Sequence, residues 1–414
     1  MRKYKSTCTV MAFLLGITVL ANISYGDSES YGPRTFNSEL ALEVYVKRAG
    51  FRAKLLGKTP AKKAVSIPEC QYWWVKPNKK AESVKLGALI EQINSENVPG
   101  LQMPDDTKET QMSQLEGLEG LRLLSLHGTD VTDISLIHLK GLKKLRKVQL
   151  DGTKVTGWGL RYFHELKELR DLDLSHGEVS NTGLAHIKGL NTLRRLDLSY
   201  TKVTHRGLVH IRGLSNLQEL RLGGLRISDR AMEYVGELES LQVISVRSTN
   251  VTDKGLSDLA ALTNLRILDL SHTEVSGKGL EHLAYSETLE ELDLSGSNLT
   301  NNGLSDLEKR SQLRILKLRE TDIDGDGLAH LAGLKNLWFL KLSDTNVGDK
   351  CLAHLEGLKD LQVLGLAGTP VTDKGLSHLK GLKNLVLCDL RKTHVSKKGV
   401  AGLKKSHPGL EVPH

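Results

Sequence analysis

The sequence predicts an α/β solenoid, in which short strand–helix units stack into one long structure. The chain has 414 residues, of which only 4% are aromatic and 39 are glycine, so large rings cannot fill its core. Its 39% hydrophobic and 26% charged residues are typical of a folded, soluble protein. One motif recurs every 24 residues through the C-terminal three-quarters of the chain, and such a period indicates stacked repeats.

The repeated motif is Leu-x-x-Leu-x-Leu, with conservative changes such as Val148 and Cys388. Twelve copies follow one another without an insertion, beginning at Leu121, Leu145, Leu169, Leu193, Leu217, Leu241, Leu265, Leu289, Leu313, Leu337, Leu361 and Leu385. If the first Leu is position 1, Thr occupies position 9 in nine copies and Ser297 in a tenth, whereas Gly177 and Leu225 depart. Position 12 is Ser or Thr in ten copies, and Gly-Leu-x-x-Leu follows.

Each part of this unit has a physical reading. The leucines at positions 4 and 6 alternate with a polar residue, so they share one face of a short strand. The position-9 hydroxyl can bond backbone groups where the chain leaves the strand. The Ser or Thr at position 12 is placed as a helix N-cap, as in Thr252-Asp253. The two leucines three apart then lie on one face of a short helix, and stacking joins all of these leucines into a continuous core.

The unit resembles a leucine-rich repeat over residues 121–408, and its tail is similar to the cysteine-containing subclass with Thr at the Asn/Cys position. Compact copies of this kind resemble the secreted bacterial members. The resemblance implies a curved leucine-rich-repeat solenoid over 98–414, with parallel strands on the concave face, short helices on the convex face and degenerate terminal units. Val98, Leu101 and Met103 begin the first such unit, and Leu410-x-Val412 is a final strand stub.

The N-terminus is predicted to be an export signal over residues 1–26. Arg2, Lys3 and Lys5 precede the apolar run Cys8–Ala21, and small residues at Ser24 and Gly26 mark a cut ahead of Asp27. An uncleaved anchor is the alternative. Removing three positive charges and no negative ones lowers the net charge from +8 to +5, so we expect no nucleic-acid partner. After cleavage we expect no membrane span, and a periplasmic, cell-envelope or extracellular location.

Residues 27–97 do not repeat, and we expect either a cap or a small binding module there. Glu39–Leu56 and Ala81–Ile93 are predicted to be helical, and Gln71–Val75 to be a strand or a hydrophobic plug over the first coil. The cysteines left after cleavage, at positions 70, 351 and 388, have neither zinc nor redox spacing, so no metal or cofactor is predicted.

The concave face is the predicted ligand-binding site, with an acidic middle and a basic end that carries an aromatic ring. Its candidate residues are Asp173, Asp197, Glu219, Asp269, Glu291, Asp293, Lys317, Arg319, Phe339 and Lys341. Such a bipolar surface would suit a protein or peptide partner by charge complementarity. The alternative is that Leu-Asp-Leu-Ser is a solvated form of the repeat without a ligand.

Two other features allow two interpretations each, one functional and one in which the residues have no specific role. One repeat position holds His138, His186, His210, His282, His330, His354 and His378. These could form a metal or pH-responsive stripe, but adjacent helices hold the rings too far apart for tetrahedral zinc, which favours a surface position spread by duplication. The closing Leu becomes Ser286 and Arg310 beside Tyr285 and Lys309, which is either a docking notch or drift on an exposed turn.

The motifs of serine hydrolases, zinc proteases, P-loop enzymes and dinucleotide-binding enzymes are absent from the sequence. The sequence therefore predicts an exported, non-enzymatic protein that binds a protein or peptide. Three alternatives remain. One is a cell-envelope glycan-binding or adhesion protein, which the lack of aromatic platforms disfavours. Another is a substrate-recruiting adaptor of ubiquitin-ligase type, which requires that the chain is not exported. The last is an enzyme whose catalytic part lies in 27–97.

Overall fold

The computed structural model describes residues 30–47, 53–78 and 86–414. The predicted signal over 1–26 lies outside these residues. The chain divides into two compact units, Met1–Leu196 (unit 1) and Asp197–His414 (unit 2), which we describe separately. In the described ranges, no helix has the length and apolar character needed to cross a membrane.

Unit 1 begins with antiparallel strands that join the first coil. They are β1 (Arg34–Phe36), β2 (Leu42–Lys47), β3 (Lys54–Lys58), β4 (Val65–Ile67) and β5 (Tyr72–Pro77). Strand β2 pairs with β3 on one side and β5 on the other, whereas β1 and β4 form a separate pair. On its other side β5 pairs in parallel with β6 (Gly100–Gln102), the strand of the first coil.

The predicted helix over Glu39–Leu56 is wrong, because this segment forms β2 and β3. Leu42, Val44 and Val46 are buried and alternate with more exposed residues, which is the period of a strand. The other two predictions here hold. Helix α2 (Leu86–Ser95) overlaps the predicted Ala81–Ile93, of which 81–85 lie outside the described residues, and β5 includes all of the predicted strand Gln71–Val75 except Gln71.

The coils of unit 1 each contain a short strand followed by a short helix. In order they are β6, η1 (Glu109–Gly117), β7 (Leu123–Ser125), η2 (Asp133–Leu139), β8 (Lys147–Gln149), η3 (Trp158–Glu165), β9 (Asp171–Asp173), α3 (Asn181–Leu184) and η4 (Ala185–Ile187). Strands β6 to β9 pair in parallel, each with the next. Strand β10 (Arg195–Asp197) lies at the boundary of the two units.

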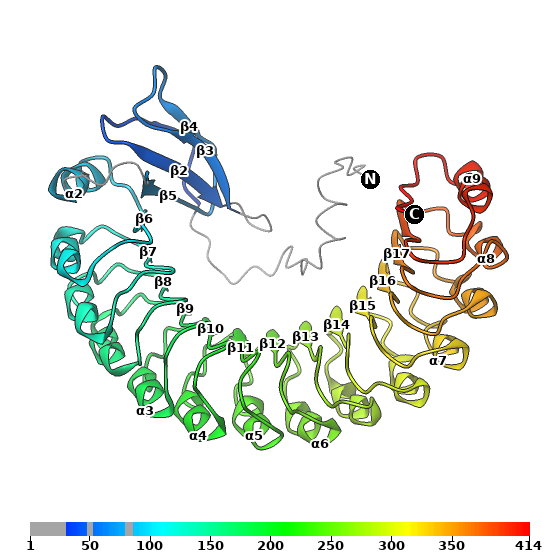
Figure 1. Cartoon of the computed structure of the whole chain (residues 1–414). Helices are drawn as coiled ribbons and strands as arrows, with labels where there is room; N and C mark the ends of the chain where they lie inside the picture. Colours follow the sequence, from blue (N-terminus) through cyan, green and yellow to red (C-terminus); the bar gives the residue numbers. More distant parts are fainter. Residues whose placement is uncertain (1–29, 48–52, 79–85) are drawn as a thin grey trace. The chain divides into compact units, whose positions relative to one another are not determined.

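Unit 2 repeats the same pattern, and Figure 1 shows its strands on the inner side of the curve and its helices on the outer side. The strands are β11 (Glu219–Arg221), β12 (Val243–Ser245), β13 (Ile267–Asp269), β14 (Glu291–Asp293), β15 (Ile315–Lys317), β16 (Phe339–Lys341), β17 (Val363–Gly365) and β18 (Leu387–Asp389). The helices are α4 (His205–Leu208), η5 (Val209–Ile211), α5 (Arg230–Gly236), α6 (Asp253–Leu256), η6 (Ser257–Leu259), η7 (Lys278–Tyr285), η8 (Asn301–Leu307), α7 (Gly325–Ala329), η9 (Asp349–Leu355), α8 (Leu376–Leu379) and α9 (Lys397–Ser406). Beyond β18, the predicted strand stub pairs with its edge, since Cys388 N–H donates to Glu411 and Leu390 N–H to Pro413.

The leucines of the motif form the core, as predicted. In the coil that begins at Leu265, the side chains of Leu268, Leu270, Val275 and Leu280 are fully buried. Burial of each such side chain contributes roughly 2 kcal/mol relative to exposure, so the repeated leucines carry most of the stacking free energy. The leucine-rich-repeat solenoid fold is thus confirmed in each unit.

The turn after each strand depends on positions 8 and 9. In ten coils the position-9 hydroxyl donates to the carbonyl of position 6, as Thr249 does to Val246 over 2.6 Å, which confirms its predicted role. In all twelve coils position 8 has a φ between 53° and 72°. Seven of these residues are not glycine, and Tyr200 is one of them, so the turn imposes this conformation even on residues with a Cβ.

On the helix side, a carboxylate at position 13 clamps each of several coils to the next. Asp253 accepts hydrogen bonds from the Ser276 hydroxyl (2.5 Å) and from the N–H groups of Ser276, Gly277 and Gly279 (3.0–3.1 Å). Burial raises the pKa of Asp253, but these hydrogen bonds outweigh burial and hold it below its ordinary value. Equivalent bonds to the next coil are made by Asp133, Asp229, Asp349 and Asp373.

This clamp changes the predicted role of position 12. The side chains of Ser180, Thr252 and Ser396 do accept an N–H of their own helix, as an N-cap should. Those of Thr132, Thr204 and Thr300 make no such bond. The hydroxyl at this position more often serves as the donor to the carboxylate of the preceding coil.

We expect Asp253→Asn to lower the free energy of unfolding at pH 7 by about 2 kcal/mol, because an amide NH2 then faces backbone N–H donors. The pKa of Asp253 is depressed, so its contribution is complete above about pH 4 and is lost as the pH falls through the lowered pKa. The difference between wild type and variant in urea unfolding should therefore narrow as the pH falls below about 4. Asp360→Asn, at an exposed loop position, is the control and should change little; a pH-independent gap at Asp253 would contradict the clamp.

Candidate functional site

The candidate site is the outward side of the strands of unit 2, which we call the strand face. The parallel register places position 3 of each strand beside position 3 of the next, and position 5 beside position 5. The position-3 column is Glu219, Val243, Ile267, Glu291, Ile315, Phe339, Val363 and Leu387. The position-5 column is Arg221, Ser245, Asp269, Asp293, Lys317, Lys341, Gly365 and Asp389. A buried, largely apolar column thus runs beside a more polar and mostly half-buried one.

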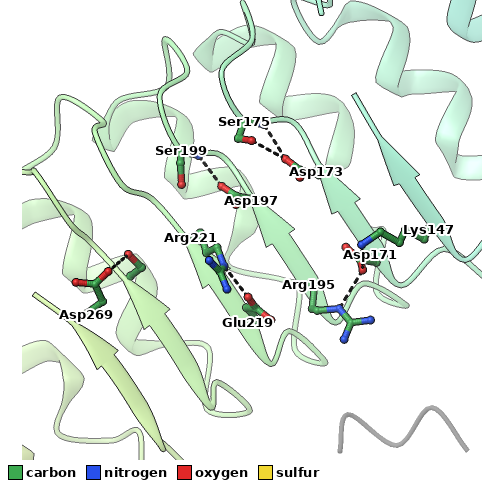
Figure 2. Close-up of polar contacts among 11 residues, drawn as sticks. Lys147, Asp171, Asp173, Ser175, Arg195, Asp197, Ser199, Glu219, Arg221 and Asp269 are labelled. Carbon is green, nitrogen blue, oxygen red and sulfur yellow. Dashed lines mark hydrogen bonds and ion pairs between the residues drawn. The ribbon is translucent and has the colours of Figure 1, made fainter. Parts of the chain in front are cut away.

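The predicted aspartates at position 5 bind the backbone of their own coil. Asp173, in unit 1, accepts hydrogen bonds from Ser175 N–H (3.1 Å) and Ser175 Oγ (2.7 Å), and Figure 2 shows both. Asp269 does the same with Ser271, at 3.0 and 2.6 Å. The N–H bond recurs in three more coils, from Ser199 to Asp197, from Ser295 to Asp293 and from Arg391 to Asp389.

These bonds give the Leu-Asp-Leu-Ser sequence a structural role, since the carboxylate satisfies the N–H of position 7. Burial is the largest influence on Asp197 and raises its pKa, although the bonds from Ser199 oppose that shift. Half-buried carboxylates in this setting are ordered before any partner arrives. The solvated reading and a binding role are therefore compatible at these positions.

Other charged residues on the strands are paired. Glu219 is buried and bonds Arg221 Nε over 2.6 Å (Figure 2). In unit 1 the carboxylate of Asp171 lies between Lys147 Nζ (2.8 Å) and Arg195 Nε (3.1 Å). Burial raises the pKa of Asp171, but the two cations outweigh it and lower this pKa to about 2.

The acidic and basic parts of the predicted surface meet at a buried ion pair. Lys317 Nζ lies 2.7 Å from Glu291 and 3.4 Å from Asp293, and only 2% of Glu291 and 7% of Lys317 are exposed. Burial lowers the pKa of Lys317, but the two carboxylates outweigh it and raise this pKa above its ordinary value. The lysine therefore stays charged and is neutralised within the protein.

The basic end differs from the expectation in two ways. Lys317 forms an ion pair with Glu291 and so is not free to bind a partner. Phe339 is only 5% exposed, because Ile315 and Val363 flank it in the position-3 column, so its ring is not open to a ligand. Arg319 is exposed, but its guanidinium pairs with Glu320 and Asp344.

Lys341 is the remaining predicted cation. It is half-buried and makes no ion pair with any residue that the structure describes. Burial lowers its pKa, and the charge of Arg319 adds to the shift.

Sequence reasoning missed two features of the strand face. Asp389 and Arg391 form a two-pronged ion pair, with hydrogen bonds of 2.9 and 2.6 Å. Gly365 leaves the position-5 column without a side chain beside Lys341. Asp389 and Gly365 stand at position 5, the position of the predicted aspartates, and Arg391 stands two residues after Asp389. Listing position 5 of every coil in the sequence would therefore have identified both features.

Contacts between coils hold three of the seven histidines of the column, and also both residues of the pattern break. His138, His330 and His378 each pair through Nδ1 with a glutamate of the preceding coil at 2.5–2.6 Å. Within the described ranges no three His, Cys, Asp or Glu side chains gather as metal ligands would. Ser286 is buried and donates to the Leu262 carbonyl, and half-buried Arg310 reaches the Leu280 carbonyl at 3.5 Å.

Comparison with known proteins agrees with this architecture. The leucine-rich repeat family matches residues 261–284 and 285–307. A leucine-rich repeat protein of Leptospira interrogans has a similar structure, with a TM-score of 0.57 and 22% identity over 82% of this chain and 89% of that one. The mouse RP105/MD-1 complex is similar with a TM-score of 0.56 and 18% identity, over 74% of this chain and 58% of that one. No curated protein matches the sequence. The chain therefore contains leucine-rich repeats and has their solenoid fold.

Removal of one partner of the Glu291–Lys317 pair should be costly. Lys317→Met leaves a carboxylate with 2% exposure unpaired, and we expect the free energy of unfolding to fall by about 3 kcal/mol. The double variant Glu291→Leu, Lys317→Met continues the apolar column and should lie within about 1 kcal/mol of wild type in urea unfolding. A double variant as unstable as the single one would contradict this view of the pair.

Proposed function

We propose that this protein is an exported, non-enzymatic binding protein whose strand face recognises a protein or peptide partner. The observation that carries the proposal is the register of β11 to β18, which aligns the mostly half-buried position-5 residues over eight strands beside the buried position-3 column. An extended segment or a protein surface laid across these strands would meet chiefly the position-5 column. Pre-paired charges on the face reduce the ordering needed on binding.

Two observations favour a polypeptide partner over a glycan. Phe339, the ring expected on the face, is only 5% exposed and cannot stack on a sugar. The charged column instead suits the charged and amide groups of a protein. Of the similar structures, the mouse RP105/MD-1 structure is itself a complex of two proteins, which agrees with this choice.

Export is the second part of the proposal and rests on the charged, apolar and small-residue segments of 1–26. We expect the protein outside the cytosol, with Asp27 as its first residue. Cell fractionation followed by N-terminal sequencing checks both points. A full-length cytosolic chain would overturn export and favour an adaptor role.

The binding face can be tested by site-specific photo-cross-linking in the source cells. A benzophenone amino acid at Ser245, the second residue of the position-5 column, should cross-link a protein partner. The same group at Ser257, which is exposed on the helix side, is the matched control and should not. Ser245→Trp should then weaken capture of the cross-linked partner at least tenfold, because a bulky ring lifts the partner off the strands. Cross-links from Ser257 alone would place binding elsewhere.

A further inference from the structure

On the strands, the backbone of several coils already binds a carboxylate, namely that of the chain's own aspartate at position 5. In the coils of Asp173 and Asp269, one carboxylate oxygen takes both the N–H and the hydroxyl of the position-7 serine, at 3.0–3.1 Å and 2.6–2.7 Å. In three further coils the aspartate also accepts the position-7 N–H, and Asp389 accepts the Arg391 guanidinium as well. The backbone of the coil is therefore shaped to present donors to a carboxylate above position 7.

The coil of β16 has the same donors but not the carboxylate. Its position-7 residue is Ser343, which offers the N–H and hydroxyl that Ser175 and Ser271 use, yet position 5 is Lys341 instead of Asp. Among the residues described, nothing accepts a hydrogen bond from Ser343 N–H or from the Lys341 ammonium. The missing anion is thus replaced by a third donor.

Gly365, in the next coil, lies directly beside both of these residues. A Cβ built on Gly365 would lie only 3.3 Å from Lys341 Cγ and 3.4 Å from Ser343 Oγ, so a side chain at this position would crowd the lysine and the serine. The carboxylate of Asp389 follows in the column, but Arg391 binds it with two hydrogen bonds and neutralises it. The position-3 neighbours, Phe339 and Val363, are apolar.

We infer that Lys341 and Ser343, beside Gly365, form a subsite for the carboxylate of an Asp or Glu side chain in the partner polypeptide, next to the apolar position-3 residues Phe339 and Val363. The partner's carboxylate takes the place that the chain's own aspartate holds in the coil of Asp269. This inference rests on the proposed function and specifies the partner's chemistry. The half-buried, unpaired ammonium, whose pKa burial and Arg319 depress, gains most from such an anion.

The test uses Lys341→Asp, which restores the aspartate of the other coils and fills the subsite from within. Random dodecapeptides displayed on phage are panned against the full chain, and the affinity of the selected peptides is measured by calorimetry. We expect an acidic residue between apolar ones, and a loss of about tenfold or more on Lys341→Asp and on Lys341→Met. Lys335→Asp makes the same charge change at an exposed loop position and should bind as wild type does. The melting temperature of Lys341→Asp should not fall.

The outcomes separate this inference from the proposed function. If peptides lose affinity on Ser245→Trp but bind Lys341→Asp as tightly as wild type, the subsite is wrong and the strand face still binds. If the selected peptides lack an acidic residue but still lose affinity on Ser245→Trp, the conclusion is the same: the subsite is wrong and the strand face still binds. If the peptides bind Ser245→Trp unchanged, or if panning yields none, both proposals fail. A lower melting temperature for Lys341→Asp would contradict the analogy with Asp269.

Discussion

The rest of the structure depends on the hydrogen bonds between adjacent coils. The strand of each coil is only three residues long, so no coil could hold a sheet on its own. Stacking in parallel register gives the inner strands of a unit two neighbours each, and this works only if each coil returns to the same point. The constant 24-residue length satisfies that condition. The threonine bond at position 9 and the carboxylate clamp at position 13 fix the two turns where a coil could otherwise slip.

Much of this was predictable because it repeats. The twelve leucine motifs gave the strands, the core and the hydroxyl of Thr249 and its equivalents, since one physical reading applied to every copy. The segment before the repeats had no such redundancy, and there Glu39–Leu56 was misread as a helix although Leu42, Val44 and Val46 alternate. The carboxylate clamp was also missed. Asp253 looked like part of a helix cap in its own coil, because its partners lie in the next one.

The candidate site shows what a linear pattern leaves out. The sequence placed Glu291, Asp293 and Lys317 on one face, but it did not show that the lysine is buried between the two acidic side chains. Phe339 was expected as an open ring, but its flanking residues in the column cover it. Pairing and burial between neighbouring coils depend on side-chain direction, which a column of letters does not contain. The predicted aspartates at position 5 proved easier to interpret, since each binds an N–H two residues along its own chain.

The pairing of Glu411 and Pro413 with β18 affects whether protein molecules can associate end to end. A stack of identical coils ends in an open strand edge, which is a template for another molecule to continue the stack. Here that edge is covered by an irregular segment, in which the carbonyls of Glu411 and Pro413 accept the N–H groups of Cys388 and Leu390. A stack of repeats could in principle continue from one molecule to the next and form filaments. In this protein the edge of β18 is already occupied by the protein's own residues, which hinders such growth at that edge.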